Sequence, residues 1–100
     1  MERKFLKGDI VGHFKREKMS EEQLDREPNM YLYEIIGTAR NTESEEKLMI
    51  YKPLYDTECV NGVDYVARPI EMFTSEVDHL KYPDIKQKYR FEKIGEGEEI

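Results

Sequence analysis

The chain has 100 residues, of which 16 are Lys or Arg and 22 are Asp or Glu, so its formal net charge at neutral pH is −6. A chain of this length supports one compact domain with a single core, which excludes large active sites assembled from several domains. The negative charge argues against bulk attraction to nucleic acid or to an anionic membrane, unless the basic residues are segregated.

Cysteine content and apolar runs bear on the compartment. Cys59 is the single cysteine, so an internal disulfide is excluded and a reducing cytoplasm is the expected location. Residues 1–9 lack the apolar stretch of a secretory signal. Apolar runs such as 30–33 are far shorter than the stretch of about 20 residues that crosses a bilayer, so we expect no membrane contact. Glu58 disfavours a reactive thiolate at Cys59, which makes a packing role the simpler interpretation.

The basic residues are segregated along the chain. Residues 1–18 hold six basic and three acidic residues, and residues 81–94 hold five basic and two acidic residues. Between them, residues 19–46 hold eight acidic and two basic residues. The first and last strands of a small barrel are often neighbours, so the two basic blocks are candidates for one basic face on an acidic protein.

Five short runs have the period-two alternation or the aromatic and β-branched composition of strands. They cover residues 10–15, 31–38, 48–51, 63–67 and 89–94. Asn61-Gly62 precedes the fourth run and is typical of a two-residue hairpin turn, because both residues tolerate positive φ. Pro53 and Pro69 lack a backbone N–H, which places them at strand ends or edges.

Helix signals are weaker and lie between the strands. Ser20 and Gln23 have the spacing of a capping box, and Pro28 limits the helix to one or two turns. This helix belongs to an acidic insertion at residues 19–30. Three apolar residues further along have the spacing of a second short turn that closes one end of the sheet: Met72, Phe73 and Val77.

Together these elements predict a mainly β fold: a small, five-stranded, partly open SH3-like barrel with one or two short helical turns. The competing layout is a small twisted sheet with one helix across a face. The barrel is a single domain over residues 1–94, with a loop at 78–88 and a flexible acidic tail at 95–100. The expected core is Phe14, Tyr33, Ile35, Leu48, Ile50, Phe73 and Phe91. The remaining aromatics are candidates for the surface: Tyr31, Tyr51, Tyr55, Tyr65, Tyr82 and Tyr89.

Several blocks of the sequence occur in an order that is characteristic of one family. They are His13-Phe14-Lys15, residues 33–44, residues 51–55, residues 68–73 and Arg90-Phe91. On these blocks the chain resembles the bacterial domain-of-unknown-function family numbered 1653 over most of residues 8–94. The resemblance implies a small, stand-alone, cytoplasmic bacterial protein and adds no biochemical role.

The chain departs from the pattern of that family in three places. Residues 16–30 form an acidic insertion where the family connects its first two blocks quickly. Residues 41–44 read Asn-Thr-Glu-Ser where the family has His-Ser-Glu-Thr, and Val66-Ala67 stands where the family has a Trp. The resemblance therefore supports no site here that needs a histidine in this turn or an indole for stacking.

His13 is the first candidate for chemistry. It shares a predicted strand face with Lys15, whose charge favours the neutral imidazole, so the ring suits a base or a metal ligand. The simpler interpretation is a half-buried strand histidine, because a second ligand at a local spacing is missing, and we expect no metal site. Glu43 lies among the carboxylates and hydroxyls of residues 42–46, which suit acid–base chemistry or a solvated turn equally well.

Arg68 is the second candidate. Pro69 restricts the backbone beside it, so the guanidinium projects in a defined direction, as a site for an anion requires. The alternative is a structural ion pair with Glu71 or Asp64.

The sequence therefore predicts six ligand-binding residues: His13, Lys15, Glu43, Tyr51, Tyr55 and Arg68. They favour a non-catalytic binding module that recognises a peptide or protein segment. The alternative is binding of single-stranded nucleic acid or a nucleotide through a local basic and aromatic face. A small hydrolase that pairs His13 with Glu43 is a weaker hypothesis. We expect no cofactor, and a monomer or a weak homodimer formed through an open strand edge.

Overall fold

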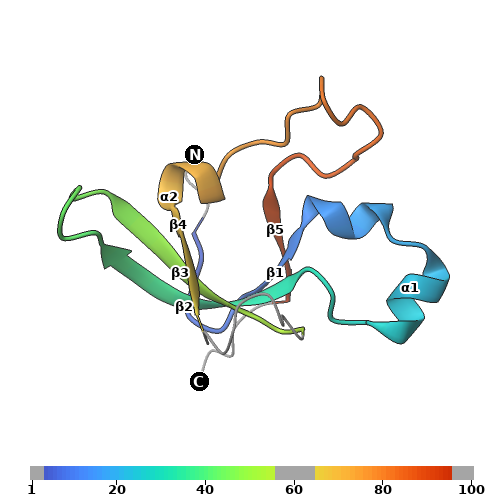
Figure 1. The fold of residues 1–100 in the computed structure, drawn as a ribbon, viewed down its shortest axis with the longest axis horizontal. Coiled ribbons are helices and arrows are strands. Elements are labelled where there is room, and N and C mark those ends of the chain that lie inside the picture. The colour runs from blue at the N-terminus through green and yellow to red at the C-terminus, as the bar shows by residue number, and fades with distance from the viewer. Residues whose placement is uncertain (1–3, 56–64, 96–100) are drawn as a thin grey trace.

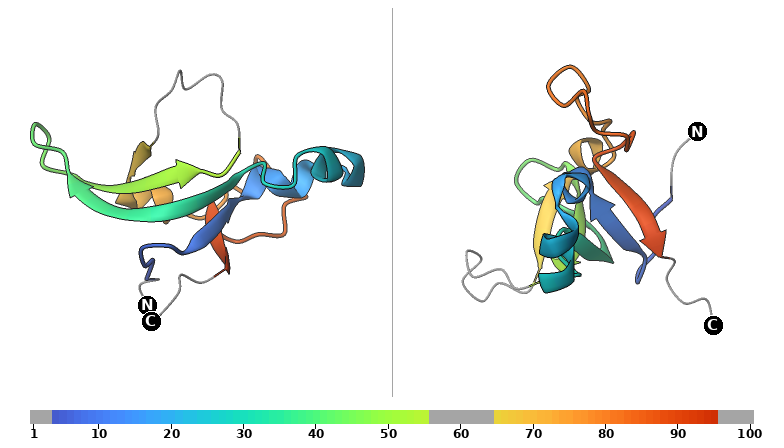
Figure 2. Two further views of the ribbon diagram at one scale, coloured as in Figure 1. Left: turned by 90° about the horizontal axis from the view of Figure 1, so that it is seen from below. Right: turned by 90° about the vertical axis from the view of Figure 1, so that its right-hand side faces the viewer.

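The computed structural model describes residues 4–55 and 65–95, and its central feature is one antiparallel sheet. The five strands lie in the order β4-β3-β2-β1-β5 (Figure 1). Their bounds are β1 Ile10–His13, β2 Leu32–Arg40, β3 Lys47–Pro53, β4 Val66–Pro69 and β5 Phe91–Gly95. The sheet curls like a barrel and stays open, because β4 and β5 form its two edges (Figure 2). The predicted mainly β, five-stranded, partly open fold is confirmed.

Short helices connect the strands, and their bounds are η1 Phe14–Lys18 (a 3-10 helix), α1 Glu21–Arg26 and α2 Ile70–Phe73. The predicted capping box is present, because the Ser20 hydroxyl accepts the Gln23 N–H and the Gln23 side chain accepts the Ser20 N–H. Figure 1 shows η1 and α1 projecting together from one end of the sheet. The second predicted turn is α2, which ends before Val77.

Two strands are shorter than predicted. The alternation predicts a first strand through Lys15, whereas β1 ends at His13 and η1 follows at once. The His13 side chain explains this end, because its Nδ1 accepts the Lys15 N–H at 3.1 Å and caps η1. The last strand begins at Phe91, and Tyr89 forms only an isolated bridge with Glu76.

β5 lies beside β1, so the first and last strands are neighbours. Val11 pairs with Lys93 in this antiparallel ladder. The pairing brings residues of the two basic blocks together: the ammonium groups of Lys18 and Lys81 each lie 5.4 Å from the centre of the Tyr82 ring. Lys18 from the first basic block and Lys81 from the second therefore meet at one aromatic ring.

β2 and β3 form a long hairpin that extends away from η1 and α1 (Figures 1 and 2). Its ladder shifts register between Ile35 and Gly37, which marks a bulge. The side-chain oxygen of Asn41 accepts the backbone N–H of Glu43 at 2.9 Å and orders the hairpin turn. The turn lies at the end of the sheet opposite to the helical insertion.

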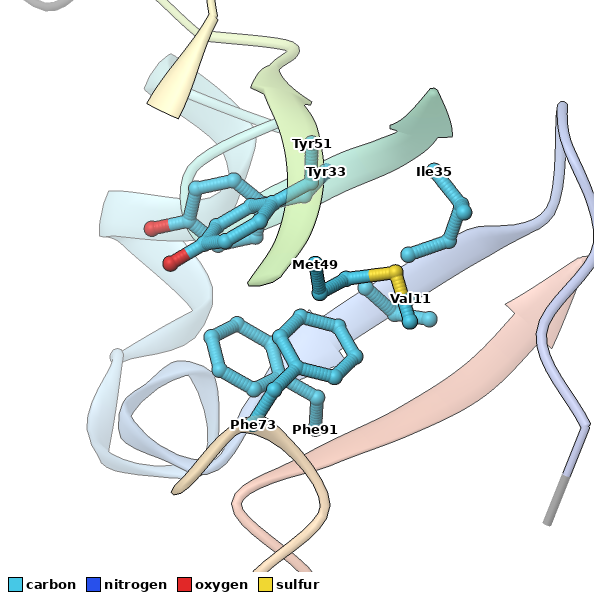
Figure 3. Packing of buried hydrophobic residues seen from close by; sticks show 7 residues of the cluster. All are labelled: Val11, Tyr33, Ile35, Met49, Tyr51, Phe73 and Phe91. Atoms are coloured by element: carbon cyan, nitrogen blue, oxygen red, sulfur yellow. The ribbon is translucent and has the colours of Figure 1, made fainter. Parts of the chain in front are cut away.

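The main core fills the inner face of the sheet (Figure 3). It contains Val11, Tyr33, Ile35, Met49, Tyr51, Phe73 and Phe91. Phe73 of α2 stacks on Phe91 of β5, with ring centres 4.3 Å apart and ring planes 9° apart. This stacking holds α2 against the inner face.

The face of β3 that packs against the core is the opposite of the predicted one. The third predicted strand is apolar at every position, so its alternation does not fix the phase. Met49 and Tyr51 are buried, whereas Leu48 and Ile50 are only half-buried. The reason is the pairing of Tyr51 with buried Ile35 across the ladder, since paired residues share a face. The prediction that Tyr51 is a surface aromatic is therefore wrong.

A smaller cluster lies beneath the loop that precedes β5. Phe14 of η1 packs with Val77 and Ile85, and Tyr82 covers them. Residues 78–88 form a loop, as predicted, and this loop packs over η1. It has a small core of its own, which fixes it against the helical insertion.

Some predictions fall outside the described residues: the Asn61-Gly62 hairpin turn, the packing role of Cys59 and the acidic tail after Gly95. The fourth strand is described from Val66 onward. Both prolines lie where the sequence predicts them, because Pro53 ends β3 and Pro69 ends β4.

Candidate functional site

Four predicted ligand-binding residues gather around one end of the core: His13, Tyr51, Tyr55 and Arg68. His13 ends β1, Tyr51 lies in β3, and Arg68 lies in the edge strand β4. Arg68 pairs with Met49 of the core, so its side chain lies on the inner face of the sheet. The curvature of the sheet thus brings together residues that are far apart in sequence.

Tyrosine rings line this end of the core. The hydroxyl oxygens of Tyr33 and Tyr55 are 2.7 Å apart and share a hydrogen bond, and the Tyr33 ring meets the Tyr51 ring edge-on at 5.2 Å. Figure 3 shows the Tyr33 and Tyr51 hydroxyls on the same side of the core. Burial, with the hydrogen bond to Tyr55, raises the pKa of Tyr33 above its usual range, so the phenol remains protonated.

Arg68 lies at the margin of these rings. Its Nε donates to the Tyr51 hydroxyl at 3.2 Å, and its guanidinium carbon lies 5.8 Å from the centre of the Phe91 ring. The side chain is half-buried, yet no described carboxylate forms an ion pair with it. The sequence suggested Glu71 or Asp64 as a structural partner of Arg68. Glu71 forms no ion pair with it, and Asp64 lies outside the described residues.

His13 forms a wall of the site and is 93% buried, with 7% of its surface exposed. Its ring meets Phe91 edge-on at 5.0 Å, and its Nδ1 accepts the Lys15 N–H. Burial first, and then the charges of Lys15, Arg90 and Arg68, lower the pKa of His13 to about 4. The imidazole is therefore neutral at neutral pH, and one ring nitrogen is already committed to a structural hydrogen bond.

The structure does not bring Glu43 into this cluster, and Lys15 takes part only through its backbone N–H and its charge, both of which act on His13. The Lys15 side chain is exposed on η1, and Glu43 lies in the exposed turn of the β2–β3 hairpin. The backbone N–H of His13 donates to the carbonyl of Tyr31, which directly precedes β2. Glu43 instead follows the far end of that strand. At about 3.3 Å per residue, the length of β2 separates the two by on the order of 30 Å. The pair required by the hydrolase hypothesis is not assembled.

Sequence patterns alone did not identify two residues of this cluster. Arg90 is half-buried, donates from Nε to the Ser75 hydroxyl at 3.3 Å, and its charge acts on His13. Tyr31 lies 6.1 Å from the His13 ring and 6.0 Å from the Tyr55 ring, between ring centres. The expected pairing of the first and last strands was the one signal that could have placed Arg90 near His13.

The chemistry of the cluster suits an anion that carries an apolar or aromatic neighbour. A half-buried guanidinium without a described counterion offers N–H donors in a fork that matches a carboxylate or a phosphate. A guanidinium that is partly withdrawn from water binds such an anion more strongly than an exposed one does. Among residues 4–55 and 65–95, no group of three or more His, Cys, Asp or Glu residues is arranged to hold a metal ion. No helix in the described part of the chain has the length and apolar character to span a membrane.

Comparison with known proteins places the chain in one family and supplies no characterised relative. Searches of curated proteins and of solved structures return no match. The family whose sequence pattern matches is described as a protein of unknown function (DUF1653), and the match extends over residues 9–93. This range includes every residue of the cluster described above. The chain therefore belongs to the DUF1653 family.

Proposed function

We propose that this domain is a non-catalytic binding module that recognises a peptide segment through an acidic side chain or terminal carboxylate held by Arg68. The observation that carries the proposal is the half-buried guanidinium, which has the Tyr51 hydroxyl and the Phe91 ring as its described partners and no described carboxylate. Removing a guanidinium from water without a counterion is costly, and a bound carboxylate offsets that cost.

The electrostatics around His13 support the same proposal. Three cations depress the pKa of His13 and so report a positive potential at this end of the core: Lys15, Arg90 and Arg68. A local positive potential on a chain of net charge −6 attracts an anionic group and orients its approach. The neutral imidazole adds no negative charge that would oppose the ligand.

A peptide is favoured over a nucleic acid by the charge of the surroundings. Nucleic-acid affinity depends on neutralising several successive phosphates, which requires a continuous basic track. Here only three cations act on His13, which is too few for such a track, and the whole chain is acidic. A single carboxylate on a segment with aromatic or aliphatic neighbours fits the cluster with fewer like-charge contacts.

The proposal is tested by NMR titration of the isotope-labelled full chain. The probes are a pool of N-acetylated tetrapeptides with two glutamates and two varied positions, and an oligothymidylate of matched charge. We expect the peptides to shift the Arg68 Nε–H and the ring resonances of Tyr51 and Tyr55. Arg68→Gln is expected to remove these shifts, whereas Arg40→Gln, on the exposed end of β2, keeps them.

Two outcomes overturn the proposal. Shifts around Arg68 with the oligothymidylate alone establish the nucleic-acid alternative in its place. Peptide shifts that persist in Arg68→Gln show that this guanidinium does not hold the ligand. Thermal denaturation of both variants establishes that each is folded.

A further inference from the structure

η1, α1 and the segment that leads from α1 to β2 build a groove beside the Arg68 site. The groove has a volume of about 690 Å³ and lies between η1, α1, the start of β2 and the loop before β5. Met19, Met30 and Tyr82 contribute its apolar surface. A groove of this size accommodates several side chains of a bound ligand, since binding pockets commonly enclose about 300 to 1,000 Å³.

Hydrogen bonds fix both walls of the groove to the fold. The Arg16 guanidinium donates from Nη1 to the Met30 carbonyl at 2.7 Å and closes the insertion. On the other side, the Glu17 carboxylate accepts the backbone N–H groups of Lys86 and Gln87 at 2.9 and 2.6 Å. The walls are therefore held in place before any ligand binds, which lowers the entropy cost of binding.

One face of α1 is directed into the groove. Gln23, Arg26 and Glu27 line it, and their spacing of three and four residues places them on one side of a helix. The acidic residues Glu21 and Asp25 do not line it. An insertion that is acidic in sequence thus presents a mixed face to the groove.

The charge of the groove is opposite to that of the chain. Three cations line it, Lys15, Lys18 and Arg26, against the one carboxylate of Glu27. The net charge of the whole chain is −6, so this excess of positive charge is local. Methionine and tyrosine surfaces adapt to apolar side chains of varied shape. Charge and polarity together match an extended segment that carries both acidic and apolar residues.

Tyr31 connects the groove to the Arg68 site. Its ring lines the groove and also lies 6.0 Å from the ring of Tyr55. The Tyr31 backbone has φ of 64°, a left-handed conformation that disfavours a bulky side chain. Such strain is retained where the surrounding structure holds the residue in place, often at binding surfaces. The Tyr31 ring is therefore the side chain that the two regions share.

We infer that the ligand is an extended acidic peptide that passes from Arg68 across Tyr31 into this groove, where Lys15, Lys18 and Arg26 bind its carboxylates. The inference rests on the proposed function for the placement of one end of the peptide. The length and the composition of the peptide are inferred from the size of the groove and from its lining residues. Segments with basic residues are excluded by like-charge contact with the same three cations.

The experiment compares two fluorescent peptides by anisotropy. The short probe is the best acidic tetrapeptide from the titration, and the long probes extend it at either end with alternating aspartate and leucine. We expect one long probe to bind about tenfold more tightly, which corresponds to about 1.4 kcal/mol. Lys18→Glu with Arg26→Glu is expected to abolish this gain and to leave the affinity for the short probe unchanged.

A matched control carries the same change of charge elsewhere. Arg40→Glu with Lys47→Glu alters two exposed cations on the β2–β3 hairpin and should preserve the gain. If neither extension improves affinity, or if both double variants reduce it equally, the groove is not the binding surface and the inference is overturned. If the short probe fails to bind, the Arg68 site is overturned instead. If a long probe still binds in that case and loses affinity in Lys18→Glu with Arg26→Glu, the ligand lies in the groove alone.

Discussion

The hydroxyl of Tyr51 accepts a hydrogen bond from Nε of Arg68 at 3.2 Å, and this contact joins the buried centre of the sheet to its edge. The Tyr51 ring is 4% exposed, so the position of its hydroxyl is fixed by packing. The orientation of the guanidinium therefore depends on a core residue. A side chain that packs in the core and also aims a charged group at a ligand contributes to stability and to binding together.

Replacing Tyr51 by Phe tests this dependence. The ring remains and the hydrogen bond is lost, so the free energy of unfolding should fall by only about 1 kcal/mol. Peptide affinity should fall by a larger factor, about tenfold, because Arg68 loses its fixed orientation. Thr74→Val is the control, since it deletes a part-buried hydroxyl that donates to the Ile70 carbonyl and leaves the Arg68 bond intact. Equal losses of affinity in the two variants would contradict the orienting role of Tyr51.

The buried imidazole of His13 predicts a dependence of stability on pH. The pKa of His13 is lowered from 6.5 to about 4 in the folded chain, by burial first and then by Lys15, Arg90 and Arg68. Between these values the unfolded chain binds a proton that the folded chain does not, so the free energy of unfolding falls as the pH falls through this window. The loss from His13 between about pH 7 and about pH 5 should be about 2 kcal/mol.

Urea denaturation at each pH measures this contribution against His13→Asn. The asparagine oxygen can still accept the Lys15 N–H, which keeps the cap of η1, and it does not titrate in this range. The stability of the variant should therefore depend less steeply on pH than that of the parent chain. Parallel pH profiles for the two proteins would show that His13 is not the titrating group.

Asp9 is expected to be a strong determinant of stability. It is 1% exposed, and its Oδ2 accepts the Leu6 N–H at 2.7 Å and lies 3.1 Å from Nζ of Lys93. Asp9→Ala leaves these donors without their acceptor and should lower the free energy of unfolding by about 3 kcal/mol. Asp9→Asn retains an acceptor and should lose less. Chemical denaturation gives both values, and equal losses would show that the negative charge beside Lys93 matters more than the retained acceptor or the volume of the side chain.

Tyr31 should separate stability from binding. Asparagine tolerates the left-handed backbone that Tyr31 adopts at φ 64°, so Tyr31→Asn relieves strain while it removes a half-buried ring. The two effects oppose one another, and the midpoint of thermal unfolding should change little. Affinity for the long peptide should drop, because the ring that the Arg68 site and the groove share is removed. A large loss of stability with unchanged affinity would assign Tyr31 a structural role alone.

The sequence predicted the number of strands, the capping box and the neighbouring first and last strands, because each depends on local patterns or on general rules of small barrels. It placed Leu48 and Ile50 in the core, where Met49 and Tyr51 lie. In a run that is apolar throughout, the sequence does not show which alternate residues face the core. Pairing with β2 decides this, and pairing is a tertiary effect.

The candidate site was predicted less completely than the fold. His13, Tyr51 and Arg68 were selected as chemically distinctive residues, and the sheet brings them to one end of the core. Glu43 was selected on composition, which carries no information on distance along a long hairpin. The groove depends on hydrogen bonds between η1 and the loop before β5, and no periodicity in the sequence signals contacts of that range.

The pairing of β1 with β5 also bears on how quickly the chain folds. Val11 and Lys93 come from opposite parts of the sequence, so their ladder closes a long loop and carries a large entropic cost before it is stabilised. Phe91 belongs to that late-forming strand, and its stacking on Phe73 completes the core. The β2–β3 hairpin closes a short loop and can form first. Folding is therefore expected to take milliseconds to seconds, with the docking of β5 as its slow step.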